Sequence, residues 1–283
     1  MHLVSFEKDG EAGFGAVTDA GIVDLRERVS PGVKTLKGVL EHDVLERAAA
    51  LAEDIEATLS LDEVTLLPPL PDSGKIICVG LNYLGHVKEM GMDVPSYPSL
   101  FPRYPGSLVG HGDALVRPVV SERYDFEGEL AVVIGRRTGK TSAETALDSV
   151  AGYTILLDGS IRDWQRHTSQ YMPGKNFRRT GAMGPWLVTR DVIADPRQLT
   201  LETRLNGEVV QNGSVGDLVF PIPDLIAYIT TFMDLLPGDV ISTGTPSGVG
   251  VGREPPLFMK AGDQVEVSVS EIGTLANTVI DEN

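Results

Sequence analysis

The pattern of apolar and polar positions divides the chain at a proline-rich stretch. Before it, two apolar runs, HLVSFEKDG and EAGFGAVTD, flank Asp9-Gly10 and predict a β-hairpin, and GIVDL predicts one more short strand. Apolar residues at helical spacing predict helix between residues 35 and 59. The stretch PPLPDSGK, residues 68–75, predicts a linker. We therefore expect a small N-terminal α/β domain over residues 1–72 and a second domain over residues 73–283.

The second part of the chain consists mainly of short apolar runs separated by Gly, Pro and Asp, a pattern that predicts strands. The runs are KIICVG, ELAVVIG, YTILLD, GPWLVT, LTLETRLNG, GDVISTG and QVEVSVS. Only SAETALDSVAG and FPIPDLIAYITTFMDL have the spacing of helices. The expected fold class is α+β with a predominance of β.

Composition argues against several classes of function. Lys and Arg number 24 against 40 Asp and Glu, a net charge of −16, and no basic patch for nucleic acid stands out. The single cysteine, Cys78, leaves no disulfide within the chain and no zinc site of the CxxC type, and it fits a reducing, cytoplasmic location. No apolar stretch approaches the roughly 20 residues of a membrane span, and the charged first residues do not fit a signal peptide.

A pair of acidic residues opens one of the predicted strands. DFEGELAVVIG places Glu127 and Glu129 two residues apart, so both carboxylates would leave the same face of a strand. Two like charges so close do not both ionise unless a cation lies between them. A solvated strand edge is the alternative. Asp158, at the end of YTILLD, adds a third carboxylate, and such an all-oxygen site suits Mg²⁺, Mn²⁺ or Ca²⁺ and does not suit zinc.

Other candidate residues have ordinary structural interpretations as well. His86 and Glu89, in GLNYLGHVKEMG, are three residues apart, so on a helical turn they share a face and can hydrogen-bond. An ion pair on a solvated helix gives the same pattern. Lys175 in PGKNF and Thr245 in TGTP are equally typical of a surface loop and of a turn.

Seven blocks of sequence, taken in order, resemble the fumarylacetoacetate hydrolase family. They are DFEGELAVVIG, GYTILLDGSIRDWQ, PGKNF, GPWLVT, LNGEVVQ, PGDVISTGTPSGVG and GDQVEVSVSEIGTLANTV. The resemblance extends from Lys75 nearly to the C-terminus, about 200 residues. It implies a mixed β-sandwich or roll as the catalytic domain, a small variable domain before it, and a homodimer.

The resemblance also implies a role for each candidate residue. The implied ligands of Mg²⁺ or Mn²⁺ are Glu127, Glu129 and Asp158. The implied catalytic residues are His86 as general base on a mobile lid, Glu89 as its orienting partner, and Lys175 as stabiliser of an oxyanion. The residues expected to contact the substrate are Arg162, Gln165 and Thr245, together with Tyr171 from the insertion-like segment RHTSQYMPG.

The activity that the resemblance implies is hydrolysis of a carbon–carbon bond in an acylpyruvate, a small 2-oxo acid that chelates the metal. Cleavage leaves a pyruvate enolate, whose charge a Lewis acid stabilises. The alternatives are decarboxylation of a 2-oxo diacid such as oxaloacetate, isomerisation of a 2-hydroxydienoate, dehydration of a sugar-derived 2-keto acid, and metabolite binding without catalysis.

The chain departs from the family's pattern close to the predicted metal site. Leu157 stands where Asn is common, Gly159 and Ile161 stand where Val and Ala are common, and Arg103 stands where Lys is common. These positions lie near the metal or the pocket mouth, so the resemblance does not determine which substrate the protein uses.

Overall fold

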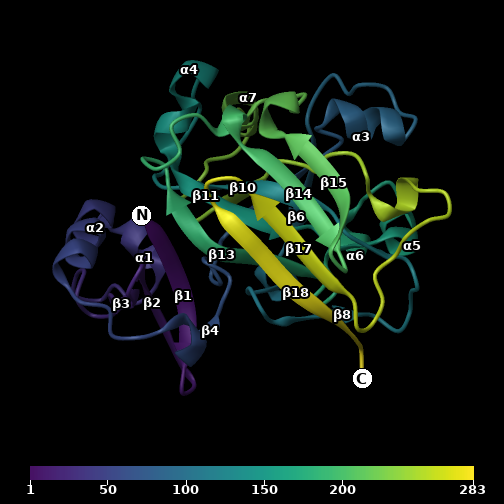
Figure 1. Cartoon of the computed structure of the whole chain (residues 1–283). Coiled ribbons are helices and arrows are strands. Elements are labelled where there is room, and N and C mark those ends of the chain that lie inside the picture. The colour runs from purple at the N-terminus through teal and green to yellow at the C-terminus, as the bar shows by residue number, and fades with distance from the viewer.

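One large sheet runs through both predicted parts of the chain (Figure 1). The computed structural model describes residues 1–283. The sheet has eleven strands, of which β4 (Thr65–Leu66) pairs with β1 and β7 (Leu108–Val109) with β13. The other nine follow the spatial order β3 (Gly21–Asp24), β2 (Glu11–Thr18), β1 (His2–Lys8), β13 (Gly181–Thr189), β11 (Val150–Leu157), β10 (Gly128–Ile134), β16 (Val240–Ser242), β5 (Ile76–Gly80) and β6 (Ser99–Arg103).

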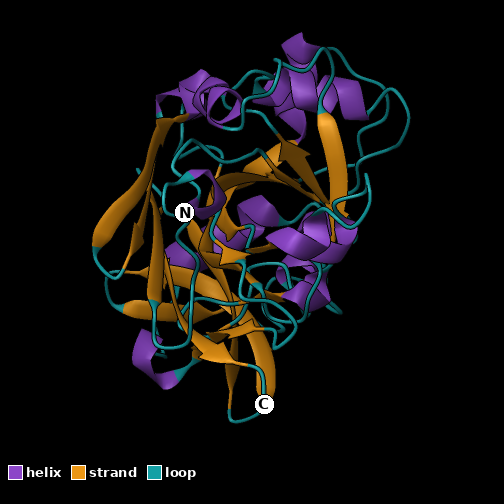
Figure 2. Cartoon of the chain, turned by 90° about the vertical axis from the view of Figure 1, so that its right-hand side faces the viewer, coloured by secondary structure: helices purple, strands orange, loops and turns teal.

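A second sheet of five strands packs against the first through contacts of β14, β17 and β18 with β10, β11 and β13. Its spatial order is β15 (Glu208–Ser214), β14 (Thr200–Leu205), β17 (Gln264–Val269), β18 (Gly273–Asp281) and β8 (Ala114–Arg117). A third sheet is the short pair β12 (Ser160–Ile161) and β9 (Tyr124–Asp125). The fold is α+β with more strand than helix, as predicted (Figure 2).

The helices are short and connect strands along the chain. They are α1 (Leu36–Glu41), α2 (Leu45–Asp54), α3 (Leu84–Glu89), α4 (Ala143–Ala146), α5 (Arg162–Gln165), α6 (Met172–Lys175) and α7 (Ile222–Ile229). Single 3₁₀ turns occupy Leu61–Glu63, Pro105–Ser107, Leu147–Ser149, Pro196–Gln198, Val215–Asp217 and Gly250–Gly252. None of the helices combines the length and the apolar character needed to cross a lipid bilayer.

The predicted strands all form, but the predicted helices are shorter than their sequence patterns. The segment 35–59 divides into α1 and α2, because Asp43 adopts a φ of 55° in the left-handed region, where a helix ends. The last residues of SAETALDSVAG belong to β11, and FPIPDLIAYITTFMDL is helical only within α7.

The N-terminal segment contributes to the main sheet and does not form a sheet of its own. The register between β1 and β13 pairs Leu3 with Leu187, so the predicted hairpin β1–β2 extends the sheet of the second part. Figure 1 shows β1–β3 with α1 and α2 (purple) at one side of the molecule. In the predicted linker, Pro68, Pro69 and Leu70 are buried. The division into domains 1–72 and 73–283 stays a prediction.

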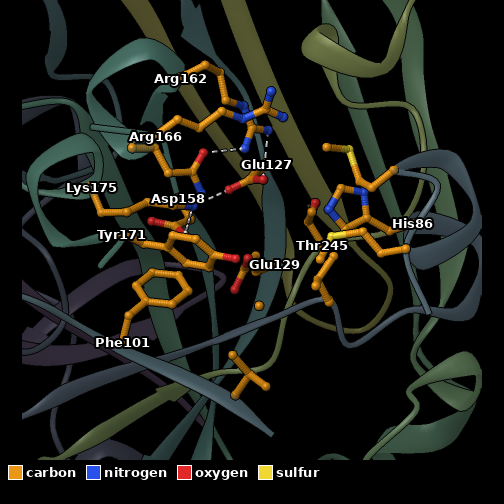
Figure 3. Close-up of a pocket in the computed structure, with 16 residues that line it drawn as sticks. His86, Phe101, Glu127, Glu129, Asp158, Arg162, Arg166, Tyr171, Lys175 and Thr245 are labelled. Carbon is orange, nitrogen blue, oxygen red and sulfur yellow. Dashed lines mark hydrogen bonds and ion pairs between the residues drawn. The ribbon is translucent and has the colours of Figure 1, made fainter. Parts of the chain in front are cut away.

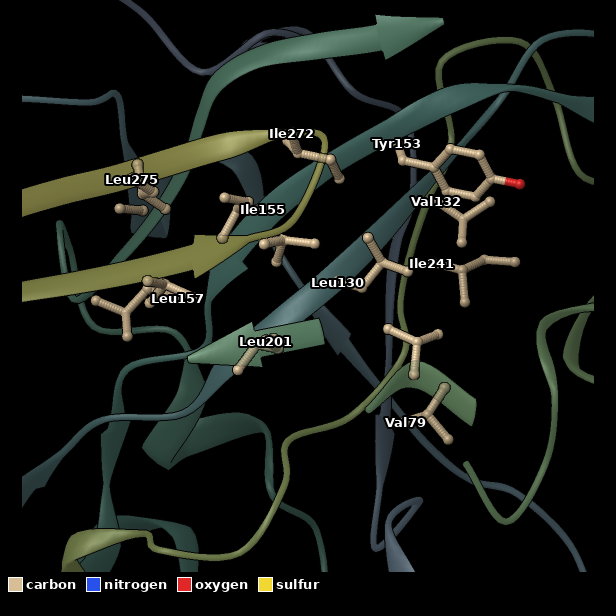
Figure 4. Close-up of a cluster of buried hydrophobic side chains, with 14 of the residues drawn as sticks. Val79, Leu130, Val132, Tyr153, Ile155, Leu157, Leu201, Ile241, Ile272 and Leu275 are labelled. Atoms are coloured by element: carbon tan, nitrogen blue, oxygen red, sulfur yellow. The ribbon is translucent and has the colours of Figure 1, made fainter. Parts of the chain in front are cut away.

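The strand alternation of β10 explains where the core and the acidic residues lie. Leu130 and Val132 belong to the core between the two sheets (Figure 4), whereas Ala131 and Val133 belong to the core on the opposite face. Glu129 shares the face of Ala131 and Val133 by the same period of two. The acidic side of β10 is therefore the face turned away from the second sheet.

Antiparallel pairing of β10 and β11 brings the third acid to the first two. The start of β10 lies beside the end of β11, with Gly128 opposite Leu157. The N–H of Asp158 donates to the carbonyl of Glu127 at 2.8 Å, which continues the ladder by one residue. Residues about 30 positions apart in sequence thus reach one corner of the sheet.

The shared sheet predicts that both parts of the chain unfold together. Leu3→Ala should lower the free energy of unfolding by about 2–5 kcal/mol, because it leaves a cavity in a core to which both parts contribute. Chemical denaturation should show one transition that shifts as a whole. Leu61→Ala is the matched control, since Leu61 is exposed. A separate transition that alone responds to Leu3→Ala would show that the N-terminal part unfolds independently.

Candidate metal centre and active site

Three buried carboxylates converge at the junction of β10 and β11. Glu127, Glu129 and Asp158 are 4%, 2% and 0% exposed, and one oxygen from each lies within 4.8 Å of the others. This confirms that the two glutamates share one face of the strand and that Asp158 joins them. It also excludes the alternative of a solvated strand edge.

Glu127 is surrounded by positive charge. The guanidinium of Arg162 donates to Oε1 at 2.7 Å, the ammonium of Lys175 forms a close ion pair with Oε2, and the hydroxyl of Ser160 donates to Oε2 at 2.9 Å. Burial alone would raise the pKa of Glu127, but the charges of Arg162 and Lys175 outweigh it and hold that pKa well below its usual range. Glu127 is therefore ionised at neutral pH.

Asp158 is paired with two cations from opposite directions. Its Oδ2 accepts from Lys175 Nζ at 2.5 Å, and its Oδ1 pairs closely with Arg103 Nη1. Arg103 is 1% exposed and also donates to the hydroxyl of Ser107 at 3.0 Å and to that of Thr180 at 3.2 Å. The residue that departs from the family's lysine thus fixes one oxygen of Asp158.

Glu129 is the carboxylate without a cationic partner. Its Oε2 accepts from the hydroxyl of Ser242 at 2.5 Å and from the N–H of Gly244 at 3.0 Å. Burial raises the pKa of Glu129 well above its usual range, and the neighbouring charges of Asp158 and Glu127 raise it further. Of the three carboxylates in this corner, Glu129 is the one that its neighbours destabilise most in the ionised form.

The charges around the site fit a bound divalent cation. Four buried carboxylates meet three buried cations, because Asp125 accepts from Arg162 Nε at 2.8 Å and joins the same network. The donor set is three carboxylates without histidine or thiolate, the set that Mg²⁺ and Mn²⁺ prefer. One excess negative charge beside three converging oxygens is what a hard cation would neutralise.

Lys175 lies among the carboxylates themselves. Burial by itself would lower its pKa, but the charges of Asp158 and Glu127 outweigh burial and raise the pKa above its ordinary value. The side chain is therefore an ammonium at neutral pH. Its Nζ also lies 5.0 Å from the centre of the Phe101 ring, which closes one side of the site.

His86 and Glu89 form the predicted hydrogen-bonded pair on α3. The distance from His86 Nδ1 to Glu89 Oε2 is 3.1 Å. Because a carboxylate accepts, Nδ1 carries the proton in the neutral ring and Nε2 keeps its lone pair. The other oxygen of Glu89 accepts from the N–H of Gly248 at 2.8 Å, so Glu89 both orients the ring and fastens α3 to the loop after β16.

One small cavity of about 290 Å³ connects these groups (Figure 3). Of the ten residues singled out from the sequence, all except Glu89 line it. Figure 3 shows His86 on one side, the three carboxylates in the centre, and Lys175 on the other side. The structure therefore brings the residues singled out from the sequence together, and their roles as catalytic residues, metal ligands and substrate contacts stay predictions.

The four predicted substrate contacts differ in how free their polar groups are. Arg162 uses its donors on Asp125, Glu127 and Gln165. The hydroxyl of Thr245 donates to the carbonyl of Gly128 at 2.9 Å. Tyr171 packs edge-on against Phe101 at 5.6 Å between ring centres, and its hydroxyl makes no hydrogen bond within the protein. The polar groups of Arg162 and Thr245 are thus already bonded within the protein, whereas the hydroxyl of Tyr171 is free to contact a ligand.

Sequence reasoning missed several residues that hold the site together. Gln211, from β15, accepts from the N–H of Gly128 at 3.0 Å and donates to the hydroxyl of Thr245 at 2.8 Å. A side chain at Gly128 would meet Thr203 of β14, since a Cβ there would lie 2.3 Å from its Oγ1. Glycine between the two glutamates is therefore a requirement of sheet packing. The block LNGEVVQ contains Gln211, but nothing in it indicates this contact.

Comparison with known proteins identifies the family. The family model described as fumarylacetoacetate (FAA) hydrolase, C-terminal, matches residues 75–280. The chain belongs to the fumarylacetoacetate hydrolase family. It is thus an enzyme of this superfamily, and the resemblance found in the seven blocks is confirmed.

Relatives within the fumarylacetoacetate hydrolase family extend over the whole chain. The human mitochondrial oxaloacetate tautomerase FAHD2A is 41% identical over 99% of this chain and 89% of its own length. The oxaloacetate tautomerase YisK of Bacillus subtilis is 46% identical over 78% of this chain and 74% of its own. The solved fumarylacetoacetate hydrolase of Exiguobacterium antarcticum is 35% identical and superposes with a TM-score of 0.88, with both chains covered completely.

The electrostatics of Glu129 predict opposite effects of one substitution with and without metal. In EDTA, Glu129→Gln should raise the melting temperature at neutral pH, because folding of the wild type must either bury a charge that its neighbours repel or take up a proton to remove that charge. A carboxyl with a raised pKa in the folded state costs stability as the pH rises through and above the usual range, so the gain should vanish in acid.

Millimolar Mg²⁺ or Mn²⁺ should stabilise the wild type by mass action and leave Glu129→Gln almost unchanged. Thermal unfolding at several pH values measures both effects. Glu202→Gln, on the surface of β14, is the control. A melting temperature of the wild type that ignores both metals would contradict a cation site here.

Proposed function

We propose that the protein is an Mg²⁺- or Mn²⁺-dependent tautomerase of small 2-oxo diacids of the oxaloacetate class. The observation that carries the proposal is the oriented His86, which faces three converging carboxylates across one small cavity. The relatives named oxaloacetate tautomerases support the choice of reaction. A volume of about 290 Å³ is at the lower end for small-molecule sites and favours a four-carbon diacid.

The reaction needs only a proton exchange across two neighbouring atoms. In the direction from enol to keto, the oxygen on C2 loses its proton, C3 gains one, and the double bond moves from C2–C3 to C2–O. His86 exchanges the proton at C3 through Nε2, because imidazole takes up and releases protons readily near neutral pH. Glu89 holds the ring in the tautomer that leaves Nε2 free.

The remaining residues stabilise the anionic enolate through which both tautomers interconvert. Glu127, Glu129 and Asp158 would hold the divalent cation, which supplies a Lewis acid for negative charge on substrate oxygens. Lys175 lines the cavity as an ammonium and donates to the developing oxyanion. Phe101 and Tyr171 exclude water from the side opposite His86.

A second candidate is hydrolysis of the carbon–carbon bond of an acylpyruvate. The same His86–Glu89 pair would remove a proton from a water molecule, which attacks the distal carbonyl, and the broken bond would leave a pyruvate enolate that then takes up a proton. The full-length likeness to a structure named fumarylacetoacetate hydrolase favours this alternative. Decarboxylation, dienoate isomerisation and sugar-acid dehydration also pass through an enolate or enol and belong in the same substrate panel.

A direct assay distinguishes these reactions. Conversion of enol-oxaloacetate to the keto form is followed by the loss of enol absorbance, beside acetylpyruvate cleavage and CO₂ release from oxaloacetate. We expect tautomerisation to be fastest and to stop in EDTA. Acetylpyruvate cleavage that exceeds tautomerisation would favour the hydrolase, and turnover of nothing in the panel would favour metabolite binding without catalysis. The predicted cytoplasmic homodimer is part of the proposal, and light scattering of the purified protein tests the dimer.

Removal of the proton-transferring ring should reduce turnover strongly. His86→Ala should lower kcat by about 10²–10⁴, the usual range for general acid–base catalysis, and Glu89→Gln should be milder because it weakens only the orientation of the ring. His42→Ala is the matched control, since His42 is exposed in the N-terminal part of the chain. Full activity of His86→Ala at saturating substrate would contradict its role in either reaction.

Lys175 should affect both catalysis and stability. Lys175→Met should lower kcat by more than it raises KM if the ammonium acts mainly on the enolate. It also leaves Glu127 and Asp158 with one counter-charge fewer, which should cost about 3–5 kcal/mol of unfolding free energy in EDTA. Steady-state kinetics and denaturation with and without Mg²⁺ measure the two effects. A change in KM alone would reduce Lys175 to a binding residue.

A further inference from the structure

The cationic side chains that line the active cavity are not equally available to a ligand. They are Arg162, Arg166 and Lys175. Arg162 is committed to Asp125 and Glu127, and its third nitrogen, Nη1, donates to Gln165 at 3.0 Å. Lys175 is paired with Glu127 and Asp158. The charges of both are therefore largely neutralised by the protein.

Arg166 differs because its side chain makes no hydrogen bond and no ion pair within the protein. The residue follows α5 directly, and its backbone N–H donates to the carbonyl of Asp163 at 3.1 Å, so its position on the cavity wall is fixed. The side chain itself is exposed. Figure 3 shows Arg166 at the same wall as Arg162, above the carboxylates.

Away from the three carboxylates, the cavity wall offers a second anionic group some neutral polar side chains and one unpaired guanidinium, that of Arg166. Away from the metal-binding corner the walls are largely apolar, and they include Val79, Met90, Met92 and Phe101. A 2-oxo diacid carries one carboxylate next to the keto oxygen and a second carboxylate at its far end. Once the first is held at the corner, the far carboxylate gains from a cation of its own, because a charged donor compensates best for the water that the carboxylate loses on entering the cavity.

We infer that Arg166 binds the distal carboxylate of the substrate and thereby selects 2-oxo diacids over 2-oxo monoacids. The inference rests on the proposed function, since it extends the same site. A guanidinium presents two parallel N–H groups that match both oxygens of a carboxylate, which a lysine at this position would not do. Arg166 is then a specificity-determining residue, whereas His86 acts on C3 and Lys175 on the oxygen of C2.

The test compares oxaloacetate with its 4-methyl ester, which has the same carbon skeleton but no distal charge. Equilibrium binding in the presence of Mg²⁺ and kcat/KM for tautomerisation are measured for both compounds. Arg166→Gln should weaken oxaloacetate binding by about tenfold, which corresponds to about 1.4 kcal/mol, and leave the ester nearly unchanged. Arg166→Lys should fall in between. Higher ionic strength should reduce the wild-type preference, because the side chain lies near solvent.

Arg178→Gln is the matched control, since Arg178 is also exposed, follows soon after in the chain and does not line the cavity. Equal losses for diacid and ester in Arg166→Gln, or no loss for either, would overturn the inference and leave the proposed function standing. Selective binding of the diacid through Arg166 without any turnover would support the inference and overturn the proposed function. A wild type that binds neither compound would overturn both.

Discussion

The structure depends on burying four carboxylates and three cations in one corner of a sheet. Each of these charges would be costly to bury alone, and each is tolerated because a partner from another segment lies within hydrogen-bonding distance. Asp158 at the end of β11 meets Arg103 at the end of β6 and Lys175 at the end of α6. The network therefore connects segments that lie far apart in the sequence. Their relative positions follow from the need of each buried charge for a partner within hydrogen-bonding distance.

Much of this arrangement could be predicted from local sequence. The apolar runs gave the strands, the period of two gave the shared face of Glu127 and Glu129, and a helical spacing gave the contact between His86 and Glu89. The rest depends on pairings that no local pattern encodes. Gln211 reaches Gly128 across 83 residues, and Arg103 was visible only as an unexplained departure from a familiar motif. The polar strand β15 and the entry of β1 into the main sheet were hidden for the same reason.

The geometry also explains how one constellation supports several reactions of 2-oxo acids. Under the proposed function, the corner with three carboxylates and Lys175 would bind the keto oxygen and its neighbouring carboxylate, whatever group follows in the substrate. His86 lies on a separate helix that is fastened through the second oxygen of Glu89. Proton exchange and activation of water make similar demands on such a ring. On that proposal, the difference between reactions arises at the other end of the cavity, where this chain has an arginine and several apolar side chains.

Gly128 has a consequence for anyone who wishes to build such a site elsewhere. The triplet Glu-Gly-Glu is short enough to graft onto a strand of another scaffold, yet its middle residue owes its identity to Thr203 on a neighbouring sheet. A host strand with open space opposite the glycine would leave a void there and a backbone free to twist, which would let the two carboxylates drift apart. A functional graft would therefore need the triplet together with the strand that packs against its glycine.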